Sequence, residues 1–156
     1  MKIAVASDHM GLEMKRALAA KLSEWGHGVI DLGTDSEARC HYPVFAVRAC
    51  QTVQTGECER AVLVCGTGIG MCITAGKLTA IRAVVGHDVY ATQMSRRHNN
   101  TNVLCLGART TGIDAALAIL QTWLETPYEG GRHDERLHLI TQIEQGEGIE
   151  PGPDGR

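Results

Sequence analysis

The chain has 156 residues, of which 44% are apolar, and its formal net charge is −3. This length supports one domain with a buried core, and the slight acidity and few aromatic residues exclude a nucleic-acid surface. No apolar run is long enough to cross a bilayer or to form a signal-peptide core. We therefore expect a cytoplasmic protein whose six cysteines are free thiols.

Strands and helices are expected to alternate along the chain. Short apolar runs predict strands at Lys2–Ala6, Val29–Leu32, Arg60–Cys65, Ala80–Val85 and Val103–Leu106. Helical periodicity and helix-start signals predict helices at Leu12–Trp25, Pro43–Thr55, directly after residues 66–70, Val89–His98, Gly112–Thr126 and Arg132–Gln145. This alternation predicts an α/β fold, an open and mostly parallel five-stranded sheet with helices on both faces. Residues 1–147 are expected to form the domain, and residues 148–156 a flexible tail.

Polar side chains gather where the predicted strands end. Parallel sheets bind ligands outside the carboxyl ends of their strands. The residues expected at that edge are Asp8, His9, Cys65, Thr67, His87, Asp88 and Arg109.

The stretch Cys65-Gly-Thr-Gly-Ile-Gly70 carries the clearest chemical signal. Its glycines allow a sharp turn and a close approach to a ligand, and the N–H groups of such a turn suit an anionic oxygen. Cys65 is either a small buried hydrophobe or a reactive thiol at this turn. A phosphatase loop of the C-x5-R type is excluded, because Met71 stands where arginine is needed. The glycine spacing also lacks the dinucleotide pattern G-x-G-x-x-G.

The seven histidines show no zinc-site spacing, so we expect no metal and no cofactor. Arg132 and Arg136 lie four residues apart on the last predicted helix. Like charges at this spacing destabilise a helix unless an anion lies between them. They predict either a phosphate site or a solvated face balanced by nearby acids.

Together these segments resemble the family of B-type ribose-5-phosphate isomerases and galactose-6-phosphate isomerase subunits. The resemblance runs from residue 2 to about residue 145. The matching segments are Ser7–Gly11, His41–Pro43, Cys65–Gly70, Gly76–Lys77, Ala80–Ala83, Ser95–Asn102 and Gly130–His133.

The resemblance implies a Rossmann-like domain in a homodimer whose active sites are shared between subunits, with a tetramer left open. It also implies cofactor-independent aldose–ketose isomerisation through an enediolate, as in the pentose phosphate pathway. The family's base is a cysteine at the strand end or a glutamate just after the glycine turn. Here these positions hold Cys65 and Met71, so the implied base is Cys65.

The remaining roles come from the same resemblance. His98 would open the sugar ring with Asp8 beside it, and Thr67 would help to hold the enediolate. The implied substrate-binding residues are His9, Tyr42, Gly66, Gly68, Ile69, Gly70 and Asn99. The implied phosphate ligands are His9, Arg109, Arg132, Arg136 and His133.

One departure bears on the substrate. Gly76 stands where the family usually has asparagine before Lys77. An isomerase of allose or galactose 6-phosphate therefore stays open. Independently of this position, a metal-dependent isomerase and a non-catalytic module that binds a sugar phosphate also stay open.

Overall fold

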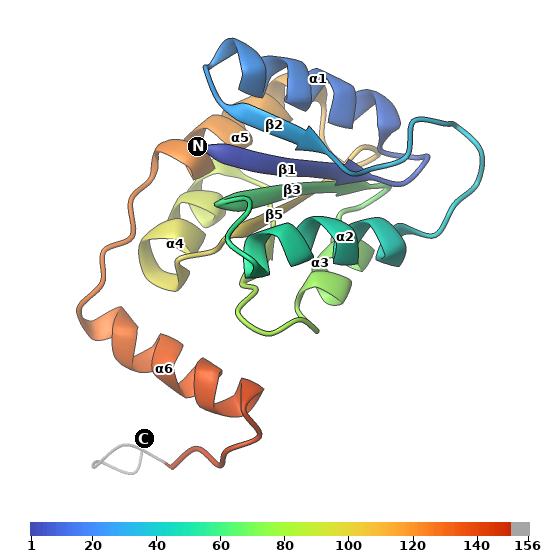
Figure 1. The fold of residues 1–156 in the computed structure, drawn as a ribbon. Coiled ribbons are helices and arrows are strands. Elements are labelled where there is room, and N and C mark those ends of the chain that lie inside the picture. Colours follow the sequence, from blue (N-terminus) through green and yellow to red (C-terminus); the bar gives the residue numbers. More distant parts are fainter. Residues whose placement is uncertain (151–156) are drawn as a thin grey trace.

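The computed structural model describes residues 1–150, so residues 151–156 of the expected tail lie outside the described part. A five-stranded, entirely parallel sheet in the order β2-β1-β3-β5-β4 forms the centre. Its strands are β1 (Lys2–Ser7), β2 (Gly28–Asp31), β3 (Arg60–Cys65), β4 (Ala83–Val85) and β5 (Val103–Gly107). The predicted α/β/α sandwich is confirmed (Figure 1).

Helices cover both faces of this sheet. The helices are α1 (Leu12–Glu24), α2 (Tyr42–Gln54), α3 (Ile69–Ala75), α4 (Val89–Asn99), α5 (Ile113–Glu125) and α6 (Arg132–Glu144). One core packs α1 and α5 against the sheet around Leu18, Leu104 and Trp123, and the other packs α2 and α3 around Cys50 and Met71. None of the helices within residues 1–150 has the length and apolar content needed to span a bilayer.

The start of the fourth strand differs from the prediction. We expected this strand over Ala80–Val85, but β4 begins at Ala83. Ala80 adopts φ 62°, and the Asn102 side chain holds the loop by donating to the Ala80 carbonyl and accepting from the Arg82 N–H, both at 2.8 Å. An amide from a distant loop thus replaces the ladder hydrogen bonds that an extended segment would make.

Helix α6 stands apart from the rest of the chain. It follows Gly130 and Gly131, whose φ values of 64° and 60° turn the chain away from α5. In Figure 1, α6 lies below α4, on the side opposite to the arrowheads of β1 and β3. Its apolar residues Ile140 and Ile143 are 40% and 56% exposed. The apolar face of α6 is therefore left without a full partner within residues 1–150 of one chain.

Candidate active site

A pocket of about 470 Å³ opens at the carboxyl ends of β1 and β3. The chain reaches β2 on one side of β1 and then returns to β3 on the other side, so this is the switch point of the sheet, where such folds bind ligands. The pocket is lined by Asp8, Tyr42, Cys65, Gly66, Thr67, Ile69, Gly70 and Ile73. The structure therefore brings together much of the site expected from the sequence.

Cys65 is the last residue of β3 and is only 5% exposed. Its Sγ accepts the backbone N–H of Gly68 at 3.2 Å. Gly68 adopts φ 77°, a conformation that L side chains rarely take, and this allows the loop to fold back over the sulfur. The thiol thus lies at the pocket wall with a backbone donor directed at it, while Met71 is fully buried in the core.

Neighbouring backbone holds this loop tightly from behind. A methyl group at Gly107 would lie 2.6 Å from the carbonyl carbon of Thr67, so β5 and the loop are in direct contact. The N–H groups of Ala108 and Arg109 donate to the carbonyls of Cys65 and Gly66, each at 2.9 Å. The position of the loop is therefore fixed by the sheet.

Tyr42 closes one side of the pocket. A methyl group at Gly70 would lie 2.7 Å from its ring, so the tyrosine ring is in close contact with the glycine. Only a glycine at this position leaves room for that contact. The Gly66–Gly70 segment thus serves both the loop conformation and the pocket wall.

Asp8 faces the same pocket and is 6% exposed. Its Oδ1 accepts the N–H groups of Met10 at 2.9 Å and Gly11 at 3.1 Å, which fixes the carboxylate. The neighbouring His9 accepts the Cys40 N–H on Nδ1 at 3.3 Å. Arg109 reaches the same loop, with Nη2 3.7 Å from the Met10 sulfur.

The predicted acid/base residue His98 belongs to a second group of side chains. Its ring stacks on His133 with 4.3 Å between centroids, and Glu129 Oε2 lies 3.7 Å from Nε2 of each histidine. Arg97 forms an ion pair with Glu129. Sequence reasoning missed Glu129; its only signal is the four-residue spacing to His133.

Charges and burial shape this group. The hydrogen bond from Arg97 lowers the pKa of Glu129. Burial, followed by the charges of His98 and Arg132, lowers the pKa of His133, whose Nε2 has no hydrogen-bond partner within residues 1–150. The possible ligand atoms of His98, Glu129 and His133 lie within 4.8 Å of one another, so this group could hold a metal ion. The histidine spacing in the sequence did not indicate it.

The two groups are not brought together in one chain. Helix α4 runs from the carboxyl end of β4 back to the amino end of β5, so His98 and Asn99 lie in its last turn, away from Cys65. The expectation that Asp8 lies beside His98 is therefore not met within one chain. Asn99 instead lines another pocket, which also contains Gly76 and Leu137.

The expected phosphate ligands are divided in the same way. His9 and Arg109 lie near the Cys65 pocket, whereas Arg132, His133 and Arg136 lie on α6. Neither arginine of α6 forms an ion pair with a carboxylate within residues 1–150, and Nη1 of Arg136 donates to the Arg132 carbonyl at 3.3 Å. Their positive charge remains available to a ligand.

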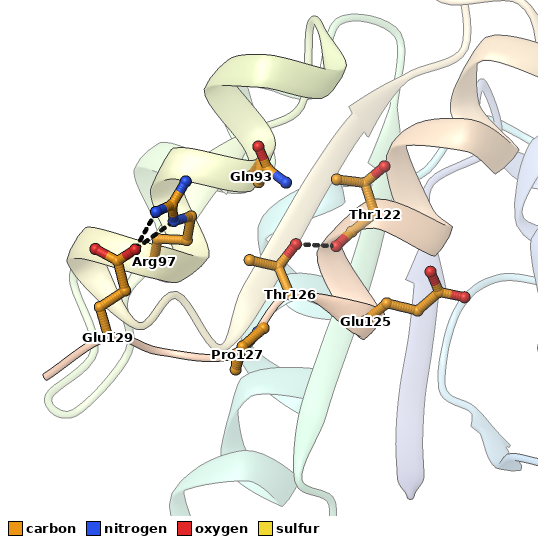
Figure 2. A pocket seen from close by; sticks show the side chains of 7 residues that line it. All are labelled: Gln93, Arg97, Thr122, Glu125, Thr126, Pro127 and Glu129. Atoms are coloured by element: carbon orange, nitrogen blue, oxygen red, sulfur yellow. Dashed lines mark hydrogen bonds and ion pairs between the residues drawn. The ribbon is translucent and has the colours of Figure 1, made fainter.

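A further pocket of about 490 Å³ lies between α4 and α5 (Figure 2). Figure 2 shows Gln93 and Arg97 on one side and Thr122 on the other, with the Arg97–Glu129 ion pair at one end. The Thr126 hydroxyl donates to the Thr122 carbonyl at 2.6 Å. Because Arg97 and Glu129 already pair with each other, this pocket offers a ligand less than the one at Cys65.

Comparison with known proteins agrees with this geometry. Residues 3–140 match the model of the family described as Ribose/Galactose Isomerase. The chain is 46% identical over 144 residues to ribose-5-phosphate isomerase B of Escherichia coli, covering 92% of this chain and 97% of that protein. It is 35% identical over 148 residues to D-erythrulose-4-phosphate isomerase of Pectobacterium atrosepticum, covering 94% and 97%. The structure of ribose-5-phosphate isomerase B from Clostridium thermocellum superposes with a TM-score of 0.93 at 44% identity, covering 94% and 99%.

Proposed function

This chain belongs to the ribose/galactose isomerase family and is a sugar-phosphate isomerase, and from that premise we propose that it interconverts ribose 5-phosphate and ribulose 5-phosphate with Cys65 as the base. The observation that carries the proposal is the Cys65 thiol at the switch-point pocket, with the Gly68 N–H directed at its sulfur. The similar proteins named for ribose 5-phosphate support the choice of substrate.

Isomerisation of an aldose requires one group to move a proton between neighbouring carbons. A thiolate at Cys65 takes the proton from C2 of the open-chain sugar, and the resulting enediolate takes it back at C1 while the hydroxyl proton on O2 moves to O1. Met71 has no group that accepts a proton, and its burial keeps it out of the pocket. Cys65 is thus the base that the pocket offers at this position.

The enediolate carries negative charge on oxygen, which fixed donors stabilise. Oγ1 of Thr67 accepts the Ile69 N–H at 3.3 Å, so its hydroxyl hydrogen is left to donate to the sugar. We assign to Thr67 the role of binding an enediolate oxygen. Gly66 and Gly70 allow the sugar to approach the loop backbone closely.

We propose that the active site is completed by a second copy of the chain. The acid/base residue His98 lies at the far end of α4, and no movement within a packed sheet brings it to Cys65. Exposed apolar residues lie on both halves: Ile69 and Ile73 are 50% and 60% exposed beside the pocket, and Ile143 is 56% exposed on α6. A two-fold homodimer in which α4 and α6 of each subunit cover the pocket of the other would bury both patches.

In that dimer, His98 of one subunit opens the sugar ring beside Asp8 of the other, and Asn99 orients the sugar. The phosphate is then held between His9 and Arg109 of one subunit and the α6 residues of its partner. Two guanidinium groups suit a dianionic phosphate because each offers paired donors. The α6 residues in this role are Arg132, His133 and Arg136.

A hexose 6-phosphate is the alternative substrate, because the family description includes galactose. The replacement of asparagine by Gly76 first suggested it. However, Gly76 lines the pocket of Asn99 and not the pocket of Cys65 in the same chain. Gly76 could therefore bear on the choice of a hexose only if, in the proposed dimer, it faces the Cys65 pocket of the other subunit.

Turnover of ribose 5-phosphate, allose 6-phosphate and galactose 6-phosphate, measured with a chelator present, tests the proposal. We expect the pentose phosphate to be preferred, and Cys65→Ala to lose about 10²–10⁴-fold in turnover, as expected for loss of a general base. Cys58→Ala is the matched control, because Cys58 is a buried thiol outside the pocket.

If the enzyme prefers a hexose phosphate, the proposed base would stand but the proposed substrate would be wrong. Activity that the chelator abolishes would favour a metal held by the His98 group. Full activity in Cys65→Ala would contradict the assignment of the base. Ligand binding without turnover in the wild type would indicate a binding module.

A further inference from the structure

Three arginines converge at the amino ends of the strands, on the side of the sheet opposite to Cys65. Arg60 opens β3, Arg82 directly precedes β4, and Arg96 lies in the last turn of α4. All three line one pocket of about 470 Å³, together with Asn100 and Asn102. None of them has a role in the proposed isomerisation.

Backbone carbonyls hold each guanidinium group from one side. Nη1 of Arg60 donates to the Trp123 and Leu124 carbonyls at 2.9 and 3.2 Å, and Nε of Arg82 donates to the Asn100 carbonyl at 3.0 Å. Nη1 of Arg96 donates to the Thr101 carbonyl. The Nη2 groups of all three arginines have no hydrogen-bond partner within residues 1–150. The three cations are therefore positioned, while donors remain free.

The charge of this cluster is not balanced by ion pairs within the described part of the chain. Arg96 is only 6% exposed, and burial, together with the charges of Arg60 and Arg82, lowers its pKa to about 10. Glu59, the carboxylate at this pocket, accepts the Lys2 backbone N–H at 3.2 Å, and burial lowers the pKa of Arg60 although the charge of Glu59 opposes this. Gathered like charges cost free energy that a bound anion would offset.

We propose that this arginine cluster is a second oxyanion site, which binds inorganic phosphate or the phosphate group of a small metabolite. Three fixed guanidinium groups around one pocket match the several oxygens of a phosphate better than a single carboxylate. Arg60 and Cys65 stand at opposite ends of β3, about 17 Å apart at the usual rise of a strand. The cluster is thus far from Cys65 of the same chain, although Arg82 also lines the pocket of Asn99, and the proposal does not depend on the proposed function.

Trp123 provides a local reporter for this site. The Arg60 guanidinium carbon lies 5.1 Å from the centre of its ring, and the indole N–H donates to Thr101 Oγ1 at 2.9 Å. The chain has only one other tryptophan, Trp25, so the two indole N–H signals in a nitrogen–proton NMR spectrum are easily assigned. Binding at the cluster should move the Trp123 signal.

The test is a titration of the full chain with inorganic phosphate, with sodium chloride at matched ionic strength as the reference. We expect a saturable shift of the Trp123 signal with phosphate only, and an affinity about tenfold weaker in Arg82→Gln, the loss expected for charge-assisted hydrogen bonds. The Arg82→Lys variant keeps the positive charge but loses the paired N–H donors of the guanidinium group, so it should bind phosphate with intermediate affinity. Arg16→Gln, an exposed arginine on α1, is the matched control and should bind as the wild type does.

Three results would overturn the proposal. The first is a Trp123 signal that follows ionic strength alone. The second is equal phosphate affinity in Arg82→Gln and Arg16→Gln. The third is a shift that disappears in Arg132→Gln and persists in Arg82→Gln, which would place the phosphate in the isomerase pocket. Arg60→Gln repeats the test should Arg82→Gln not fold, as judged by circular dichroism.

Discussion

The loop after β3 and the helix α6 carry the two halves of the proposed active site, and they are held in opposite ways. The loop is enclosed by its own chain: β5 touches it at Gly107, and Tyr42 packs on Gly70. Helix α6 lies against α4 and leaves Ile140 and Ile143 exposed. The proposed base is thus positioned by the fold of one chain, while the proposed phosphate ligands of α6 lie on a helix, called the arm below, that this fold does not fix.

This difference separates two requirements of the reaction. Proton transfer needs atoms placed to within a fraction of an ångström, and a parallel sheet provides such placement at its carboxyl edge. Capture of a phosphorylated sugar needs positive charge that can close over it. In the proposed dimer, α6 exchanged between two subunits would supply that charge and would make activity depend on assembly.

The largest expected effect comes from disturbing the rigid half. Gly107→Ala should lower turnover roughly 100-fold, because its methyl group would push the Thr67 backbone out of place, and small displacements at an active site have effects of that size. Gly112→Ala is the matched control, since a methyl group there meets nothing within 4 Å. Steady-state kinetics checks both; equal turnover in the two variants would show that the loop is not held by β5.

Removing charge from the arm should act on binding more than on chemistry. Arg132→Gln should raise KM for the sugar phosphate about ten- to hundredfold, because a charge-assisted hydrogen bond to phosphate is lost, with a smaller change in kcat. Arg16→Gln removes a charge from α1 and should leave KM unchanged. A fall in kcat alone for Arg132→Gln would exclude Arg132 as a phosphate ligand.

The apolar face of the arm should control assembly. Ile143→Asp should weaken dimerisation about tenfold or more, because the isoleucine that the proposed dimer buries would be replaced by a charge in the interface. Thr141→Asp, which changes an exposed polar residue of α6, should have little effect. Sedimentation at several protein concentrations compares the two variants; if Ile143→Asp assembles as the wild type does, the interface lies elsewhere.

The smallest expected effect concerns pH. The pKa of His133 is lowered below 6.5 by burial and by nearby positive charge. The unfolded chain therefore binds a proton that the folded chain does not, so stability should fall as the pH drops through 6.5 towards the lowered pKa. His133→Asn should flatten this part of the profile, as measured by urea unfolding across that range. An unchanged slope would show that His133 does not carry the effect.

The sequence was sufficient to predict most of the fold, because strand and helix signals are local. Val62 to Val64 is an apolar run with two β-branched residues, and it forms the buried centre of β3 as predicted. The predicted start of the fourth strand at Ala80 is wrong, because the hydrogen bonds that replace the strand there come from the side chain of Asn102, twenty-two residues away. No local pattern reports such a contact.

The candidate site divides in the same way. The switch-point residues Asp8, Cys65 and Thr67 could be placed from strand ends alone. The group around His98 could not, because Glu129 reaches it only through the turn before α6. The exposed face of α6 could not be anticipated either, because its partner is not in the local sequence but, as we propose, in a second copy of the chain.

Mixing two inactive variants tests the shared site most directly. Cys65→Ala lacks the base, and His98→Asn lacks the acid/base group for ring opening. If each site combines Cys65 of one subunit with His98 of the other, a refolded equimolar mixture contains dimers with one intact site. We predict recovery of about a quarter of wild-type activity, since half of the dimers are mixed and each has one working site of two. A mixture as inactive as its components would contradict the shared site.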